Sequence, residues 1–297
     1  MRKVLIIGGT GMLGHKLWQV ARDRRDRFDV HATVHGPVPD RGTPPLVDPA
    51  RAIGNVDAER FETVQAVLDD LRPDVIVNCV GAVKNKPGAD DAVRAIALNS
   101  LFPRLLARAA QSQGARLIHV STDCVFSGSR GRYSEEDQPD PLDLYGQTKA
   151  LGEVEGGQCL TLRTSMIGRE LRGSRGLVEW FLSRRGQTAE GYTHAIFSGL
   201  TTLALARVIA DVISEHPAMT GLFHVSASPI AKHDLLVMLN EAYDAGVRIV
   251  ASHRLHVDRS LISERFRAAT GFQPASWREM VRELREDPLP YDEWRQQ

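Results

Sequence analysis

Short apolar runs alternate along the chain with longer stretches in which apolar residues recur every three or four positions. Six of these runs have the length of a strand: KVLIIGG (3–9), DVHATV (29–34), DVIVNCVGAV (74–83), RLIHVST (116–122), QCLTLRTS (158–165) and GLFHVS (221–226). Most are continuous rather than alternating in polarity, as is typical of strands buried on both faces. The pattern therefore predicts a parallel sheet that is covered by helices on both sides.

Helical periodicity occupies much of the chain between these runs. It predicts four helices, over residues 12–24, 59–72, 91–113 and 201–215. Pro73 ends the second helix and Gly114 closes the third. Strands that alternate with helices in this way are typical of the α/β class, and we expect a Rossmann-type doubly wound parallel sheet.

After Arg163 the alternation of strand-length apolar runs with helical stretches becomes less regular. Residues 166–198 hold glycines, arginines and scattered aromatic residues with little periodicity, and residues 228–297 look helical and charged. We expect these two segments to form a smaller, mainly C-terminal lobe over one end of the sheet. The larger domain would then comprise residues 1–165 together with residues 199–227.

Composition excludes several classes of protein. The 297 residues contain 37 Lys and Arg against 37 Asp and Glu, so no net charge directs the chain to nucleic acid or to a membrane surface. No apolar run approaches the about 20 residues that span a bilayer. Cys79, Cys124 and Cys159 show neither a disulfide framework nor the spacing of metal ligands. We expect a cytoplasmic protein without a metal.

A glycine-rich turn, GGTGMLGHKL, joins the first strand to the first helix. Glycine permits a tight turn and a close approach of the backbone to a pyrophosphate, and the helix N-terminus attracts the negative charge. Because the motif follows a strand and opens a helix, it predicts a dinucleotide site. The candidate residues of this turn are Gly8, Thr10, Gly11, Met12, Leu13 and Gly14.

The end of the second strand bears on the choice of dinucleotide. A carboxylate there would accept the ribose 2′-hydroxyl of NAD, but His35 follows the strand and Asp40 is the next acid. This favours NADPH over NADH, with His35 close to the ribose. Asp57 precedes a predicted helix, and it either caps that helix or binds the adenine amino group.

The stretch DLYGQTKA places Tyr145 and Lys149 four residues apart. On a helix these side chains would share a face, and an ammonium beside a phenol lowers a phenol pKa that is ordinarily about 10. Such a pair suits a proton donor. By itself such a pair is more often part of a solvated helix face, so the choice depends on the remaining motifs.

Several motifs occur together in one order: GGTGMLG, NCVGAV, ALNSLFPRLLARAA, VSTDCVFSG, YGQTK and LRTS. As a set they resemble the extended short-chain dehydrogenases/reductases, and most of all the dTDP-4-dehydrorhamnose reductase group. GLFHVS and DRSLISERF extend the resemblance into the C-terminal half. The resemblance implies an NADPH- or NADH-dependent reductase of a nucleotide-diphosphate-linked 4-keto-6-deoxy sugar.

The resemblance also implies the catalytic residues. Tyr145 would give a proton to the substrate carbonyl oxygen, and Thr122 would hydrogen-bond that oxygen. Lys149 would bind the nicotinamide ribose and lower the pKa of Tyr145, and Asn99 would hold a proton-relay water. Both donors would face an oxygen that gains negative charge during hydride addition. Four further residues would pass beneath the cofactor: Cys79, Val80, Gly81 and Ala82.

The sugar nucleotide would bind between the sheet and the smaller lobe. The candidate residues are Lys84, Asp123, Cys124, Met166, Trp180 and Tyr192. Trp180 and Tyr192 either pack on the base or the sugar, or fill the core of the lobe. Five arginines either bind the diphosphate or form an exposed face: Arg169, Arg172, Arg175, Arg184 and Arg185.

Two positions depart from the pattern of the rhamnose reductases, which usually have an aromatic residue where Cys124 stands and often a tryptophan where Met166 stands. Both positions line the sugar pocket in that group, so the identity of the sugar stays open. Cys124 also replaces the glutamate that a 4,6-dehydratase needs. A 4-epimerase and a non-catalytic dinucleotide-binding regulatory subunit remain as alternatives, and a homodimer through the Asn99 and Tyr145 helices is expected by analogy.

Overall fold

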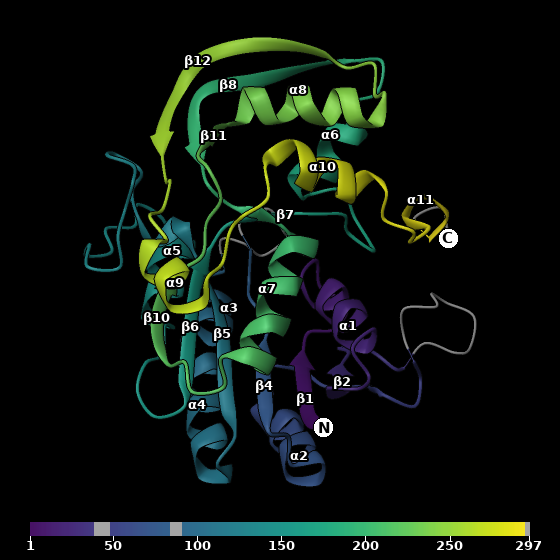
Figure 1. The fold of residues 1–297 in the computed structure, drawn as a ribbon, viewed down its shortest axis with the longest axis vertical. Coiled ribbons are helices and arrows are strands. Elements are labelled where there is room, and N and C mark those ends of the chain that lie inside the picture. The colour runs from purple at the N-terminus through teal and green to yellow at the C-terminus, as the bar shows by residue number, and fades with distance from the viewer. Residues whose placement is uncertain (39–47, 84–90, 295–297) are drawn as a thin grey trace.

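A seven-stranded parallel sheet forms the larger part of the computed structural model, which describes residues 1–38, 48–83 and 91–294 (Figure 1). From edge to edge the strands are β10 (Gly221–His224), β6 (Cys159–Thr164), β5 (Arg116–Thr122), β4 (Val75–Asn78), β1 (Arg2–Ile7), β2 (Phe28–Thr33) and β3 (Ala52–Ile53). Chain order reverses between β1 and β4, and in such sheets ligands bind at the carboxyl ends of the strands beside this point. The predicted Rossmann-type fold is confirmed.

Helices cover both faces of this sheet (Figure 1). They are α1 (Gly14–Arg22), α2 (Phe61–Leu71), α3 (Ala92–Ala95), the π-helical η1 (Ile96–Leu101), α4 (Phe102–Gln113), α5 (Leu144–Leu151) and α7 (Thr202–Glu215). Neighbouring strand residues face opposite layers: Leu5 packs with α2 and α4, whereas Ile6 packs with α1 and α7. This two-sided burial explains why the strand sequences read as continuous apolar runs.

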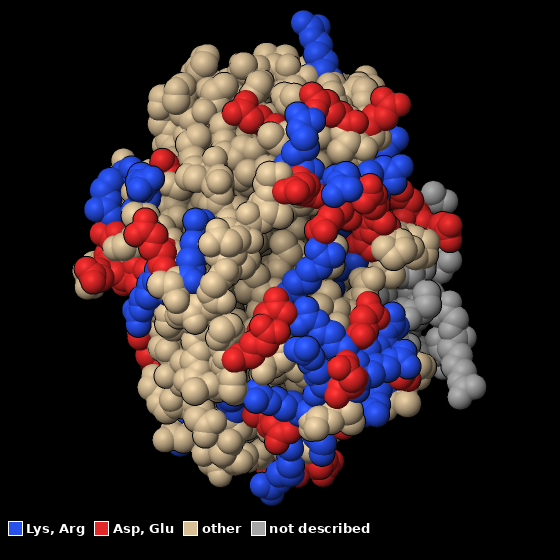
Figure 2. Space-filling view, in the orientation of Figure 1, with Lys and Arg blue, Asp and Glu red and all other residues tan. Residues whose placement is uncertain are grey.

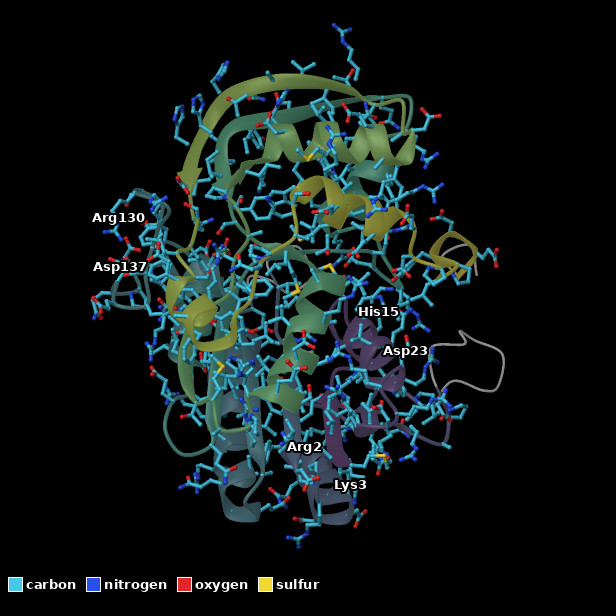
Figure 3. All side chains as sticks on the ribbon, in the orientation of Figure 1. Arg2, Lys3, His15, Asp23, Arg130 and Asp137 are labelled. Atoms are coloured by element: carbon cyan, nitrogen blue, oxygen red, sulfur yellow. The ribbon has the colours of Figure 1, made fainter. Side chains whose placement is uncertain are left out.

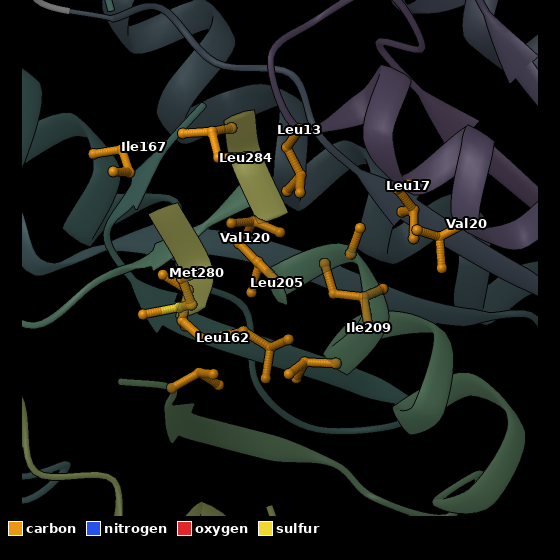
Figure 4. Packing of buried hydrophobic residues seen from close by; sticks show 14 of the residues in the cluster. Leu13, Leu17, Val20, Val120, Leu162, Ile167, Leu205, Ile209, Met280 and Leu284 are labelled. Atoms are coloured by element: carbon orange, nitrogen blue, oxygen red, sulfur yellow. The ribbon is translucent and has the colours of Figure 1, made fainter. Parts of the chain in front are cut away.

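Figure 4 shows the core on one of these faces. Leu205 and Ile209 of α7 lie between Leu17 of α1 and the strand residues Val120 and Leu162. Side chains of α10 (Trp277–Arg285) reach the same cluster from the smaller lobe. The two parts of the molecule therefore share a continuous hydrophobic core.

The predicted helix over 91–113 contains one π-helical turn. In η1 the hydrogen-bonding pattern widens, so that the Phe102 N–H donates to the Ala97 carbonyl. Pro103 follows and has no N–H to offer, which favours such an irregularity. Helix α5 approaches this turn closely: a Cβ on Gly152 would lie 1.7 Å from the Asn99 carbonyl oxygen. Glycine at this position lets the two helical segments touch.

The smaller lobe contains more strand than the sequence predicted. Its three-stranded sheet has the order β11 (Ile230–Ala231), β8 (Thr188–Phe197) and β12 (Arg248–Asp258). The other elements of residues 166–198 and 228–297 are β7 (Met166–Ile167), α6 (Leu177–Leu182), α8 (Lys232–Tyr243), α9 (Glu264–Thr270), α10 and α11 (Tyr291–Trp294), and β7 pairs with β9 (Leu200–Thr201) in a separate two-stranded sheet. The expectation of a purely helical segment over 228–297 is wrong, because β12 is an edge strand with mostly exposed side chains and so shows no apolar pattern.

Basic and acidic side chains are interspersed on the face shown in Figure 2. They are densest on the side that carries α1, α10 and α11, a second charged group projects from the opposite side, and the surface between the two is largely uncharged in this view. Neither sign dominates, in keeping with the equal numbers of basic and acidic residues. Among the described helices, none combines the length and the apolar character required to cross a bilayer.

Candidate active site

The glycine turn after β1 has the geometry of a pyrophosphate cradle. Gly8 has φ +89°, a left-handed conformation that favours glycine, and its carbonyl accepts the Gly11 N–H at 3.0 Å. A Cβ on Gly14 would lie 2.1 Å from the Gly8 oxygen, so only glycine fits there. Helix α1 begins after Leu13 without a side-chain cap, which leaves its first amides to bind an anion. These residues fit a dinucleotide.

The residues predicted near the adenosine lie beyond the end of β2. The His35 side chain is 80% exposed, and its Nδ1 is 3.8 Å from Asp57 Oδ1. Asp57 accepts the Glu59 N–H at 3.0 Å and Arg60 Nε at 3.2 Å. It does not cap α2, whose N-cap is Arg60, but orders the turn before it. Contact of either residue with the adenosine stays a prediction.

The segment after β4 passes beside the glycine turn. The predicted strand over 74–83 ends early, at Asn78, whose Oδ1 accepts the Val80 N–H at 3.0 Å. A Cβ on Gly8 would lie 2.9 Å from Val80 Cγ2, so the two segments pack against each other. Asn99 then holds Ala82 from both sides, accepting its N–H at 2.8 Å and donating to its carbonyl at 3.1 Å.

Asn99 therefore supports Ala82, one of the four residues predicted to pass beneath the cofactor. Its role in holding a proton-relay water stays a prediction. It is 1% exposed, and its Nδ2 also donates to Thr148 Oγ1 of α5 at 3.1 Å. Lys84, predicted for the substrate, lies outside the described residues.

Tyr145 and Thr122 are brought together although residues 123–143 separate β5 from α5. Thr122 ends β5, caps the following 3-10 turn η2 (Asp123–Val125), and hydrogen-bonds the Tyr145 phenol. Asp143 caps α5 by accepting the Gly146 N–H at 2.9 Å. A Cβ on Gly146 would lie 2.2 Å from the carbonyl oxygen of the residue after Asp123, so this glycine lets α5 pack against η2.

Lys149 lies one helical turn from Tyr145 and is 5% exposed. Its Nζ donates to the Val120 carbonyl at 2.7 Å. Burial lowers the pKa of Lys149 to about 8, although Glu153 and Cys79 act to raise it. The pKa of Tyr145 is raised, chiefly by burial. Burial of the phenol therefore dominates the pKa of Tyr145 in this structure, and the expected lowering of that pKa by Lys149 stays a prediction.

A buried ion pair behind Lys149 was missed by sequence reasoning. Glu153 receives Nε and Nη2 of Arg163, each at 2.7 Å, and also Ser121 Oγ at 2.7 Å. The two charged side chains are only 8% and 5% exposed. A signal was present, since Tyr145, Lys149 and Glu153 follow one another at intervals of four residues. The pair fixes the end of α5 against β5 and β6.

A cavity of about 570 Å³ opens between the carboxyl end of β5 and the smaller lobe. Four predicted substrate residues line it: Asp123, Cys124, Met166 and Trp180. Asp123 is buried next to Thr122, and burial raises the pKa of its carboxyl. Tyr192 is not among the lining residues; it lies further back on β8, opposite Ser252 of β12. Its contact with substrate stays a prediction.

Three cationic side chains line the same cavity. Arg175 is one of the five arginines proposed from the sequence, whereas Lys232 and Arg259 were not predicted. Lys232 opens α8, and Arg259 follows β12 and donates Nε to the carbonyl of Phe126 at 2.8 Å. Arg169 lies elsewhere: it is buried, and its guanidinium donates to Glu179 and Asp292, each at 2.6 Å. We conclude that Arg169 is structural.

The family model described as RmlD substrate binding domain matches residues 1–288. The chain belongs to this family. A probable dTDP-4,6-dihydroxy-2-methyloxan-3-one 4-ketoreductase of Streptomyces antibioticus is 30% identical, over 96% of this chain and 95% of that protein. The resemblance to the rhamnose reductase group is thereby confirmed.

Two further relatives of this RmlD-family chain carry different names. Over 51% of the chain and 42% of the relative, it is 34% identical to methionine adenosyltransferase 2 subunit beta of Rattus norvegicus. Among solved structures, dTDP-4-dehydrorhamnose reductase of Bacillus anthracis in complex with NADP superimposes with a TM-score of 0.79 at 21% identity. That match covers 95% of this chain and 98% of the other, and it shows the shared fold.

Proposed function

We propose that the protein is an NADPH- or NADH-dependent reductase of a nucleotide-diphosphate-linked 4-keto-6-deoxy sugar. The observation that carries the proposal is the Tyr145–Thr122 hydrogen bond, directly beside the cavity-lining residues Asp123 and Cys124, with Lys149 buried one turn away. The names of the ketoreductase and rhamnose reductase relatives agree with it. The glycine turn supports binding of the dinucleotide next to this site.

The chemistry required is reduction of the C4 ketone to an alcohol. When bound, the nicotinamide supplies the hydride. Negative charge then develops on the carbonyl oxygen, and Tyr145 gives this oxygen its phenolic proton while Thr122 donates a second hydrogen bond. Because burial raises the pKa of Tyr145, the phenol holds its proton at neutral pH until the developing alkoxide takes it.

The buried side chains of Lys149 and Asn99 have supporting roles in this proposal. Lys149 binds the nicotinamide ribose and, once engaged there, favours loss of the phenolic proton. Asn99 holds the floor segment at Ala82 and provides a position for a relay water.

The cavity suits a phosphorylated sugar. Arg175, Lys232 and Arg259 bring positive charge to it, which matches a diphosphate, and Met166 and Trp180 give it apolar surface for the sugar or base. Cys124 replaces the aromatic residue usual in the group and leaves a shorter side chain beside Tyr145. All three cysteines are free thiols, which supports a cytoplasmic location.

The proposal is tested by mixing the purified protein with NADPH and a panel of 4-keto-6-deoxy sugars linked to dTDP, UDP, GDP or CDP. We expect one nucleotide to support oxidation of NADPH, followed at 340 nm, with one equivalent of alcohol formed. A 4-epimerase would instead interconvert two sugar nucleotides without net consumption of NADPH. A regulatory subunit would bind NADPH and turn over none of the panel.

We also propose that the protein forms a homodimer through the helices that carry Asn99 and Tyr145. Five large apolar side chains are exposed on or next to these helices: Val93 (79%), Ile96 (49%), Leu101 (52%), Leu142 (76%) and Leu151 (60%). Helix α5 packs directly against α3 and η1, so these side chains lie on neighbouring segments. Such a concentration of apolar surface is typical of an interface.

The variant Leu101→Glu/Leu151→Glu is expected to halve the molar mass measured by light scattering after gel filtration, because it places charge within this surface. Leu255→Glu, at a 39% exposed leucine of β12, is the matched control and is expected to leave the mass unchanged. A wild-type monomer at micromolar concentration would contradict the dimer.

A further inference from the structure

The end of the chain lies against the first helix of the dinucleotide-binding fold. Helix α11 sits beside α1 in Figure 1, and Figure 3 shows His15 at the start of α1, on the side that faces this segment. Tyr291 of α11 is 1% exposed, and its ring meets the His15 ring edge-on with centroids 5.7 Å apart. The family match ends at residue 288, so Tyr291 and Asp292 lie beyond the part of the chain shared with the family.

A chain of hydrogen bonds runs from Tyr291 to the glycine turn. His15 Nε2 is 2.8 Å from the Tyr291 hydroxyl, and His15 Nδ1 is 2.8 Å from the Gly11 carbonyl oxygen. Burial lowers the pKa of His15 to about 4, so its ring is neutral at neutral pH. Since a carbonyl only accepts, Nδ1 carries the proton and Nε2 accepts. The Tyr291 hydroxyl has one proton for two acceptors, His15 Nε2 at 2.8 Å and Asp287 Oδ2 at 3.2 Å, and the shorter contact favours donation to His15.

This arrangement fixes the peptide group of Gly11. Its carbonyl accepts both the His15 ring and the His15 backbone N–H at 3.1 Å, while its N–H donates to Gly8 at 3.0 Å. Gly11 lies in the turn that the pyrophosphate must approach closely. A shift of this peptide would therefore change the fit of the dinucleotide.

The same segment is attached to both parts of the molecule by ion pairs, one of them between two buried side chains and the other between the buried Arg169 and the exposed Asp292. Lys16 of α1 pairs with Asp287, with side chains 1% and 3% exposed. On the other side, Arg169 binds Asp292 and Glu179, and its guanidinium lies 4.8 Å from the centroid of the Tyr291 ring. Tyr291 thus stands between the glycine turn and the smaller lobe that lines the cavity.

We propose that residues 287–294 form a C-terminal clasp that positions the glycine turn for the dinucleotide, with Tyr291 as the positioning residue acting through His15 on Gly11. The clasp rests on the proposed dinucleotide site and adds to it a segment that lies mostly beyond the end of the family match at residue 288. The affinity for the cofactor then depends on Tyr291, which is far in sequence from the glycine turn that binds the dinucleotide.

Tyr291→Phe is expected to raise the Kd of NADPH about three- to tenfold, because it removes the donor that fixes the His15 ring. The measurement is calorimetric titration of the full chain with NADPH, so it does not depend on turnover. The kcat at saturating NADPH should stay within about twofold of the wild type, so that the loss appears in KM for NADPH. His15→Ala should give a similar rise in Kd, and the double variant no more than the larger single effect, because both act through one chain of contacts.

Tyr243→Phe is the matched control. Its side chain is also buried, at 6% exposed, and its hydroxyl donates to the Leu284 carbonyl at 3.0 Å. If Tyr243→Phe lowers Tm as much as Tyr291→Phe does but leaves the Kd of NADPH unchanged, the rise of Kd in Tyr291→Phe reflects positioning of the glycine turn and not general destabilisation. Unchanged Kd in Tyr291→Phe, or additive effects in the double variant, would overturn the clasp alone. If the wild-type chain bound neither NADPH nor NADH, both the clasp and the proposed function would be contradicted.

Discussion

Tyr145→Phe is expected to lower kcat/KM for the keto sugar by about 10²- to 10⁴-fold, the usual contribution of a positioned general acid. The substitution removes one oxygen and leaves the ring in its half-buried place on α5. The Kd of NADPH should change little, because Lys149 and the glycine turn are untouched. Stopped-flow measurement of a single NADPH turnover would place the loss on the chemical step rather than on product release.

The control for this prediction has to be another buried phenol outside the site. Tyr243→Phe removes a hydroxyl that donates to the Leu284 carbonyl and also bonds the Arg169 side chain, and neither partner lines the cavity. We expect it to keep kcat/KM within about twofold of the wild type, a difference of less than about 0.5 kcal/mol. Equal turnover by Tyr145→Phe would remove the phenol from the mechanism, whereas loss of NADPH binding would indicate a structural role instead.

Glu153→Gln is expected to lower the free energy of unfolding by about 3–5 kcal/mol, because it leaves the buried Arg163 guanidinium without a counter-charge. The glutamine keeps the size of the side chain and one acceptor for Ser121. Urea unfolding followed by circular dichroism measures the change. Glu215→Gln is the comparison: its pair with Arg27 has a separation of 3.4 Å and is about half exposed, so its loss should cost at most about 1 kcal/mol.

The same variant has a second, catalytic readout. Glu153 acts to raise the pKa of Lys149, which lies at about 8, so its neutralisation should lower that pKa further. If the ammonium form of Lys149 binds the cofactor, kcat/KM for NADPH falls as the pH rises through this pKa, and in Glu153→Gln the fall begins at lower pH. If the fall of kcat/KM at high pH were unchanged in Glu153→Gln, Glu153 would have no effect on the pKa of Lys149. If Glu153→Gln and Glu215→Gln lowered the free energy of unfolding equally, the stabilising role of the buried Glu153–Arg163 pair would be contradicted.

Local patterns in the sequence were sufficient for much of the site. The glycine turn is set by steric limits within a few residues, because a side chain on Gly14 would strike the Gly8 carbonyl. Tyr145 and Lys149 face the same way because a helix repeats about every 3.6 residues. Thr122 follows directly from the end of a buried strand. In each case, contacts close in the chain decide the geometry.

Other features arise from contacts between distant parts of the chain. The strand β12 forms only because β8 offers it a partner, and its exposed side chains leave no apolar signature. Lys232 and Arg259 reach the cavity because the smaller lobe folds back over β5. The raised pKa of Tyr145 reflects burial by the whole site, which dominates over the expected effect of its neighbour Lys149.

The sequence by itself therefore determined the doubly wound sheet, the dinucleotide turn and the pairing of a phenol with an ammonium on one helix. These depend on backbone periodicity and on sterics between near neighbours. Only the tertiary structure decided which charged side chains line the cavity, that Arg169 forms a buried ion pair, and where the C-terminal segment packs. Burial and long-range pairing are properties of the folded chain, and no short stretch of residues carries them.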